Sequence, residues 1–201
     1  MATSESALGR SGRIVLADVL PGELVRDALL IIAFACLTGL SAQWEVRLPF
    51  TPVPVTGQSF AVLLGGVALG AGRALSGMVL YLVAGLTPWV PWFSGGSGGT
   101  DVLMAASFGY IVGFIFAAGL VGKLAERGWD RTPLRTIVTM VAGNLVIYAF
   151  GVPWLMAVAP SGLATGLSKG VVPFLPLDAI KIVAAAGLLP AVWALTGRRN
   201  D

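Results

Sequence analysis

Long stretches without a charged residue constrain this chain more than any other feature of its sequence. Six of them, at residues 28–44, 48–72, 74–100, 102–122, 136–168 and 182–197, contain no Asp, Glu, Lys or Arg. A helix that crosses a bilayer needs about 20 mostly apolar residues. Only 11% of the residues are charged, whereas a soluble domain carries about 25%. The sequence therefore predicts an all-α integral membrane protein with six transmembrane helices.

Residue types that the chain lacks exclude several classes of function. There is no histidine, which removes Ser-His and Cys-His catalysis, haem ligation by histidine and nearly every zinc site. The one cysteine, Cys36, can form no internal disulfide. The net charge is +3, but the basic residues are spread over the predicted loops, so we expect no nucleic-acid partner. We expect no enzyme, no cofactor and no metal ion.

Prolines, glycines and charged residues divide the chain into helices and connections. Residues 1–26 lack the apolar core and cleavage site of a signal peptide, and we expect a cytoplasmic N-terminal segment there. Residues 27–197 form the predicted transmembrane domain. Its helices are expected at about 27–44, 59–71, 74–90, 104–125 and 135–157, with a sixth starting at Pro176. The connections include a Pro-rich turn at 48–58, a Gly-rich segment at 94–99 and a Gly/Ser-containing connection at 160–173.

Basic residues predict which side of the membrane each loop faces, because cytoplasmic loops carry an excess of Lys and Arg. With both termini inside, only Arg47 and Lys169 lie in outer loops, against ten basic residues on the cytoplasmic side. Those ten are Arg10, Arg13, Arg26, Arg73, Lys123, Arg127, Arg131, Arg135, Arg198 and Arg199. We therefore expect a multi-pass protein of the bacterial cytoplasmic membrane with both termini in the cytoplasm.

An aspartate and a lysine, Asp178 and Lys181, interrupt the last apolar part of the chain. An ionisable group in a membrane helix costs about 2.5–3.5 kcal/mol on insertion scales and usually marks a pathway or a binding site. Three residues apart, the two side chains share one helix face. One alternative is that Asp178 only complements the dipole of a helix that starts at Pro176, and that Lys181 neutralises it. We favour a fixed acceptor and donor for a polar ligand, because the pair lies near the outer loops.

Further candidates for ligand binding lie in the outer loops and in two helices. Backbone N–H groups of a Gly-rich segment can approach an anion closely, although such a segment can equally be a flexible connection. Its candidate residues are Gly95, Gly96, Ser97 and Gly98. Thr56 and Gln58 offer hydrogen bonds at the end of the Pro-rich turn, which either walls a site or is only a stiff loop. Tyr110 and Asn144 contact either a ligand or a neighbouring helix.

Small residues along the first helix predict a close helix contact. They are Ala28, Ala33, Ala35, Gly39 and Ala42. A surface of this kind packs helices together within a bundle or against another subunit. The spacing does not distinguish the two cases.

Four short motifs occur in the order found in one transporter family. They are Pro49-Phe-Thr-Pro-Val-Pro-Val-Thr-Gly-Gln58, Ser94-Gly-Gly-Ser-Gly-Gly99, Gly109-Tyr-Ile-Val-Gly-Phe114 and Pro176-Leu-Asp-Ala-Ile-Lys181. From about residue 28 to 196 the chain resembles the BioY family, the biotin-binding S components of energy-coupling factor (ECF) transporters. The resemblance implies an ECF S-component-like bundle that captures biotin outside and delivers it to the cytoplasm. Where family members commonly read Gly-Pro-Thr-Gly-Gly-Tyr, this chain has Ala105-Ala-Ser-Phe-Gly-Tyr110.

The resemblance also implies roles for the candidate residues. Biotin carries a ureido ring with N–H donors and a carbonyl, and a carboxylate at the end of an apolar chain. Asp178 then accepts from the ureido N–H groups, Lys181 donates to the carbonyl, and the backbone of 95–99 meets the carboxylate. The reverse pose, with Lys181 on the carboxylate, stays open.

Partners are implied as well. S components dock on a transmembrane coupling protein through an Ala-x-x-x-Ala face of the first helix, to which Ala35 and Gly39 are the nearest match. Paired ATPase subunits supply the energy, since this chain has no nucleotide-binding motif. The sequence leaves open whether the chain transports alone or needs these partners.

Two other functions are weighed against biotin transport. One is an S component for another vitamin, such as thiamine or riboflavin. The other is a membrane-embedded enzyme, such as a lipid-modifying transferase. The absence of histidine and the scarcity of carboxylates in the apolar stretches argue against the enzyme.

Overall fold

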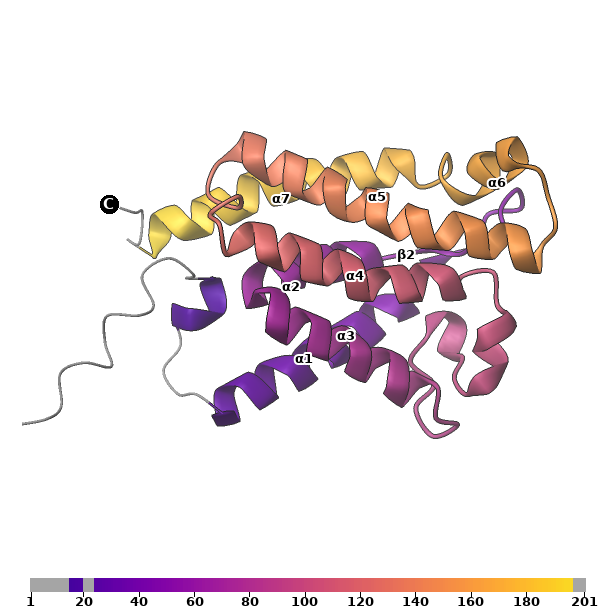
Figure 1. Ribbon diagram of the computed structural model, residues 1–201, viewed down its shortest axis with the longest axis horizontal. Coiled ribbons are helices and arrows are strands. Elements are labelled where there is room, and N and C mark those ends of the chain that lie inside the picture. The colour runs from indigo at the N-terminus through magenta and orange to yellow at the C-terminus, as the bar shows by residue number, and fades with distance from the viewer. Residues whose placement is uncertain (1–14, 20–23, 197–201) are drawn as a thin grey trace, which may run out of the picture.

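Helices that run along a common axis make up the body of the chain, as the computed structural model shows for residues 15–19 and 24–196 (Figure 1). The six longer helices are α1 (Leu24–Gln43), α2 (Gln58–Leu69), α3 (Ala71–Gly85), α4 (Phe108–Ala125), α5 (Pro133–Val158) and α7 (Leu175–Leu195). Each coincides to within a few residues with one of the six predicted helices, so the predicted all-α bundle is confirmed. Most of the expected N-terminal segment 1–26 lies outside the described residues, and its boundary stays a prediction.

Only four of these helices are long and apolar enough to cross a membrane unaided: α1, α4, α5 and α7. Helices α2 and α3 have 12 and 15 residues, which corresponds to about 18 and 22 Å at 1.5 Å per residue. That is less than the roughly 30 Å thickness of the hydrocarbon core. Short elements extend both helices at one end of the bundle. Ahead of α2 lies an antiparallel hairpin of β1 (Glu45–Val46) and β2 (Val55–Thr56), and after α3 come the 3-10 turns η2 (Ser94–Gly96) and η3 (Thr100–Met104).

One helix in the described chain was not expected. The 160–173 segment was predicted only as a Gly/Ser-containing connection, but it contains α6 (Leu163–Gly170). Its sequence hides the helix, because glycine has a low helix propensity and three glycines lie in or beside it. Tertiary packing outweighs this propensity. A Cβ on Gly166 would lie 2.7 Å from the Met156 side chain, so only glycine lets α6 settle this closely on α5.

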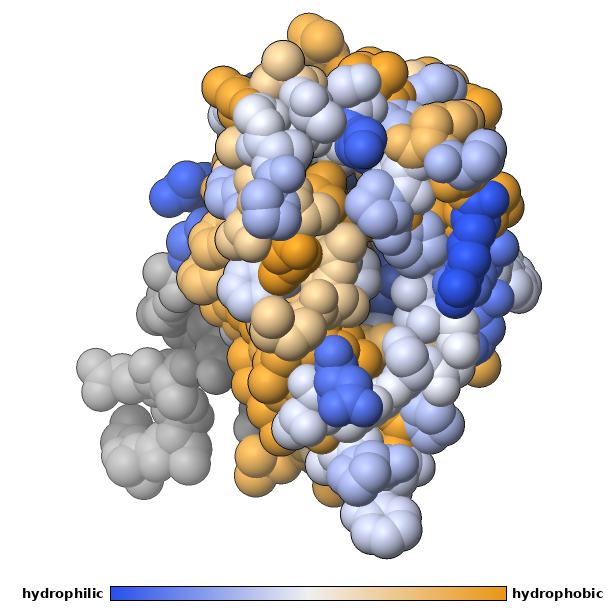
Figure 2. Space-filling model, turned by 90° about the vertical axis from the view of Figure 1, so that its right-hand side faces the viewer, coloured by the Kyte–Doolittle hydropathy of each residue, from blue (hydrophilic) through white to orange (hydrophobic). Residues whose placement is uncertain are grey.

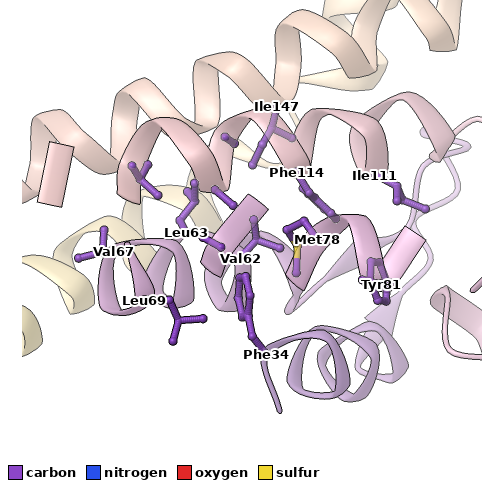
Figure 3. Packing of buried hydrophobic residues seen from close by; sticks show 14 of the residues in the cluster. Phe34, Val62, Leu63, Val67, Leu69, Met78, Tyr81, Ile111, Phe114 and Ile147 are labelled. Atoms are coloured by element: carbon purple, nitrogen blue, oxygen red, sulfur yellow. The ribbon is translucent and has the colours of Figure 1, made fainter. Parts of the chain in front are cut away.

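The core lies around α4, which packs against α5 on one side and against α2 and α3 on the other (Figure 1). Figure 3 shows the buried side chains between these helices, and shows Phe34 of α1 pointing at Val62 of α2. Phe34 is only 3% exposed, and its ring fills the space that side chains at Gly65 and Gly77 would otherwise occupy. This one aromatic ring therefore joins α1 to both short helices.

The two ends of the bundle differ in composition. The end that holds the start of α1, the α2–α3 turn, the α4–α5 loop and the end of α7 is called the basic end here. It carries all the described basic residues that were predicted to be cytoplasmic: Arg26, Arg73, Lys123, Arg127, Arg131 and Arg135. The opposite end, called the hairpin end, holds the β1–β2 hairpin, η2, η3 and α6 (Figure 1). Apart from Lys181 of α7, its basic residues are Arg47 and Lys169.

Side-chain contacts tie the helices together at the basic end. Arg73 of α3 pairs with Asp27 of α1 at 3.1 Å. The indole of Trp193 in α7 donates to Oδ2 of Asp130 at 2.6 Å, and the guanidinium of Arg131 lies 4.7 Å from the centre of the Trp193 ring. Burial raises the pKa of the Asp130 carboxyl. The α4–α5 loop therefore holds the last turn of α7 through a buried carboxylate.

Candidate ligand-binding site

A cavity lies among α2, α4, α5 and α7 near the hairpin end. Apolar side chains form much of its wall: Val53, Pro54, Ile111, Phe114, Ile147 and Phe174. The polar and charged lining residues are Thr56, Gln58, Ser59, Ser94, Ser107, Tyr110, Asn144, Tyr148, Asp178 and Lys181. Figure 2, which looks onto the hairpin end, shows hydrophilic residues scattered over this face and hydrophobic residues along its edge.

Among the residues that the structure describes, Asp178 and Lys181 are the only charged ones that line the cavity. Asp178 lies in the first turn of α7, where a negative charge is favourable near the positive end of the helix dipole. It is 6% exposed, and its Oδ1 lies 3.6 Å from Nζ of Lys181. The two side chains share one face of α7 and reach the cavity together, as their spacing predicts.

Each member of this pair is also bonded to another part of the bundle. The Tyr148 hydroxyl on α5 donates to Oδ2 of Asp178. The Lys181 ammonium donates to the Thr56 carbonyl oxygen at 3.1 Å and to Oγ of Ser59 at 2.8 Å. The carboxylate is therefore held toward α5, and the ammonium is held toward the start of α2.

The Pro-rich turn walls the cavity, with Val53 and Pro54 among the lining residues. The Thr51 hydroxyl donates to the carbonyl oxygen of Lys169 in α6 at 2.7 Å. Gln58 has both ends of its amide engaged. Its Oε1 accepts from the Thr56 hydroxyl at 3.1 Å, and its Nε2 donates to the Tyr81 hydroxyl at 2.6 Å. Gln58 thus braces the turn against α3, and it borders the cavity while doing so.

The two helical candidates, Tyr110 and Asn144, both line the cavity. The Tyr110 hydroxyl donates to the Gly170 carbonyl oxygen at 2.8 Å, and its ring occupies the space that a side chain at Gly151 would need. Tyr110 therefore presents its ring to the cavity while its hydroxyl fastens the end of α6. Asn144 is 8% exposed, and its side-chain amide has no hydrogen-bond partner within the described part of the chain. Its donor and acceptor are available to a ligand.

Gly95, Gly96, Ser97 and Gly98 do not line the cavity; within their segment, Ser94 does. A Cβ on Gly95 would lie 2.5 Å from the Arg47 guanidinium and 3.3 Å from the Glu45 carboxylate, so Gly95 lies directly against β1. The backbone of Val90 and Pro91 similarly covers Gly98. Gly95 and Gly98 are thus packed against the backbone and side chains of neighbouring loops, and ligand contact by this segment stays a prediction.

Ala35 and Gly39, predicted to form a docking face, are buried inside the bundle. Ala35 is fully buried, and a Cβ on Gly39 would lie 3.0 Å from the Trp92 side chain. Two other members of the small-residue surface, Ala28 and Ala33, are exposed. Both Ala35 and Gly39 therefore face the inside of the bundle, with Gly39 against Trp92, and their role in docking a partner protein stays a prediction.

Tyr148, Ser59, Ser107 and the apolar residues of the wall were not predicted from the sequence. A signal for two of them was present. Tyr148 follows Asn144 by four residues and therefore shares its helix face, and Ser59 directly follows Gln58. For Phe114 and Ile147 no such signal exists, because apolar residues surround a membrane helix on all sides.

A cavity with a buried acid–base pair inside a bundle of apolar helices defines a class: a membrane-embedded binding protein for a small polar molecule. The chain also matches the model of the BioY family over residues 10–198. It therefore belongs to the BioY family, a family of membrane transporters.

Similar proteins agree with this assignment. The chain is 37% identical over 176 residues to the biotin transporter BioY of Rhizobium etli, with 83% of this chain and 92% of that protein covered. It is 34% identical to the biotin transporter BioY of Thermotoga maritima, with 70% and 81% covered. A crystal structure of the S component for biotin from an ECF-type ABC transporter superposes with a TM-score of 0.72, covering 84% of this chain and 90% of that one at 21% identity. The S-component-like bundle expected from the resemblance is thereby confirmed.

Proposed function

We propose that this chain captures biotin at the outer surface of the membrane for uptake into the cell, as the substrate-binding component of an ECF-type transporter. The observation that carries the proposal is the Asp178–Lys181 pair inside the cavity. A buried carboxylate and a half-buried ammonium lie side by side there, and no other charged residue of the described part of the chain lines the wall. The relatives named above are biotin transporters.

The pair matches one end of biotin better than the other. A ureido group presents an N–H donor beside a carbonyl acceptor, and Asp178 and Lys181 offer an acceptor beside a donor. A carboxylate at the same place is attracted by Lys181 but repelled by Asp178, because the Asp178 carboxylate lies only 3.6 Å from the Lys181 ammonium. We therefore assign the ureido ring to the pair, with the thioether ring and chain on Phe114, Ile147 and the other apolar wall residues.

The remaining polar residues have a place in this arrangement. The free amide of Asn144 can hydrogen-bond the ureido ring or the chain. The carboxylate then points away from Asp178, and Ser94 is its candidate partner from the Gly-rich segment because it lines the cavity. Gly95, Gly96, Ser97 and Gly98 support Ser94 in this proposal and do not contact the ligand.

Isothermal titration of the detergent-solubilised chain with biotin tests the proposal. Asp178→Asn removes the charge of the acceptor, and Lys181→Ala removes the donor. Hydrogen bonds to charged groups contribute about 1.5–3 kcal/mol, so each substitution is expected to weaken biotin binding about 10- to 100-fold. Unchanged affinity in both variants contradicts the site. Thiamine and riboflavin are expected not to compete, and competition by either points to an S component for that vitamin.

The partners proposed for uptake are a transmembrane coupling protein and paired ATPase subunits. The support is family membership, together with the likeness of the fold to an S component. Biotin uptake by cells that contain this chain with and without the coupling protein and ATPases separates the two modes of transport. Uptake that rises only when they are present supports the proposal.

A further inference from the structure

An aspartate and a lysine on one helix face ordinarily close on each other. A charge-assisted N–H···O bond has an optimal length of about 2.7–2.9 Å. The Asp178–Lys181 distance is 3.6 Å, so the pair is drawn apart although nothing lies between the two groups on α7. The cause must lie in what each side chain bonds on its other side.

Tyr148 holds the carboxylate. It lies on α5, one turn after Asn144, and its hydroxyl donates to Oδ2 of Asp178. Oδ1, which faces Lys181, has no hydrogen bond from any described residue. The phenol therefore engages one carboxylate oxygen and leaves the other for a ligand donor.

Ser59 holds the ammonium. It lies in the first turn of α2, and its Oγ accepts from Nζ of Lys181 at 2.8 Å, next to the Thr56 carbonyl oxygen at 3.1 Å. Of these two acceptors only Ser59 uses a side chain, so it is the one that a substitution can remove. The hydrogen bonds of Lys181 therefore hold its ammonium toward α2, and the hydrogen bond from Tyr148 holds the Asp178 carboxylate toward α5.

We infer that Tyr148 and Ser59 are positioning residues that hold the acid and the base apart, so that a ligand group with adjacent donor and acceptor can enter between them. The inference rests on the proposal that biotin binds in this cavity. Without the two hydroxyls, Asp178 and Lys181 close to hydrogen-bonding distance and satisfy each other. The ligand must then break that pair before its ureido group is recognised.

Two affinity ratios measured on purified protein test this inference. The first is the affinity for biotin divided by the affinity for biotin methylated on a ureido nitrogen, and it reports recognition of the ureido N–H. The second is the affinity for biotin divided by the affinity for desthiobiotin, which keeps the ureido group and lacks the thioether ring. In Tyr148→Phe and in Ser59→Ala we expect the first ratio to fall about tenfold and the second to stay as in the wild type. A purely structural role lowers the affinity for all three ligands together.

Matched variants complete the experiment. Ser59→Thr keeps the hydroxyl and is expected to retain the wild-type first ratio. Ser41→Ala removes a hydroxyl that bonds only the Leu37 carbonyl oxygen on α1 and is expected to change neither ratio. If the first ratio stays unchanged in Tyr148→Phe and Ser59→Ala while the wild type binds biotin, the inference is overturned. A fall in only one of the two overturns the assignment of the other residue, and a wild type that binds no biotin overturns the proposed function itself.

Discussion

At the scale of single residues, most polar groups around the cavity are already bonded to one another. Asp178 and Tyr148 are 30 positions apart in the chain and share a hydrogen bond. Gln58 is engaged at both ends of its amide, and the Tyr110 hydroxyl is engaged by Gly170. The side chains of Asn144, Ser94 and Ser107 have no such bond within the described part of the chain. Substitutions at these positions therefore disturb the framework of the site as well as any contact with a ligand.

A pair of glycine substitutions separates packing from helix propensity. In Gly151→Ala the new methyl group overlaps the Tyr110 ring, and overpacking of this kind costs about 1–3 kcal/mol. We expect the thermal unfolding midpoint of the purified protein to fall by several degrees. Gly187→Ala is the control, because a Cβ there meets nothing within 4 Å, and its midpoint should stay unchanged or rise slightly. Equal midpoints for the two variants contradict the close contact between α4 and α5.

At the scale of elements, the Gly-rich segment and the β1–β2 hairpin form one cover at the hairpin end. Gly95 and Gly96 have φ values of +70° and +67°, a left-handed conformation that glycine adopts without strain. Only Gly95 lies against Arg47 and Glu45, whereas a Cβ on Gly96 meets nothing within 4 Å. Trp92 and Phe93 directly precede the segment and pack on Tyr81 of α3, with ring centres 5.2 Å from that of Tyr81 in both cases.

Alanine at these two glycines gives the second matched comparison. Both substitutions carry the same backbone strain, about 1–2 kcal/mol, but only Gly95→Ala also pushes Arg47 away. We expect bound biotin to dissociate faster from Gly95→Ala than from Gly96→Ala, as measured by release of labelled ligand from the purified protein. Equal release rates mean that contact between the hairpin and the segment does not retain the ligand.

At the scale of the whole molecule, charge is divided between the two ends of the bundle. Six described basic residues lie at the basic end. Apart from Lys181, two lie at the hairpin end, Arg47 and Lys169. By the excess of Lys and Arg in cytoplasmic loops, we propose that the basic end and both termini face the cytoplasm. The ligand cavity then lies near the outer surface.

Labelling with a membrane-impermeant thiol reagent tests this orientation. Cys36 is the only native cysteine, so a Cys36→Ser background allows single cysteines to be read without interference. In intact cells we expect Lys169→Cys, at the hairpin end, to be labelled and Arg127→Cys, in the α4–α5 loop, to be protected. Permeabilised cells should label both. The opposite pattern in intact cells inverts the proposed topology.

The positions of the longer helices along the chain could be predicted from the sequence, but the rotation of each helix about its own axis could not. The six longer helices follow from the uncharged stretches, because a bilayer requires apolar length whatever the packing. Gly166 and Gly170 concealed α6, since propensity counts against a helix that is formed by contact with α5. The small residues of α1 are a similar case. Spacing showed that Ala35 and Gly39 share a face, but only the packed bundle, with Gly39 against Trp92, shows that this face points inward.

The amino-acid sequence by itself determined the membrane location, the order of the helices and the pairing of Asp178 with Lys181, because apolar length and helical spacing are local properties. Tertiary structure decided that Tyr148 and Ser59 hold that pair, that Ser94 and not its glycine neighbours borders the cavity, and that Ala35 and Gly39 lie inside. Each of these depends on how helices distant in the chain rotate against one another. In an apolar bundle that rotation is set by many small packing contacts between segments, and no single segment of sequence contains them.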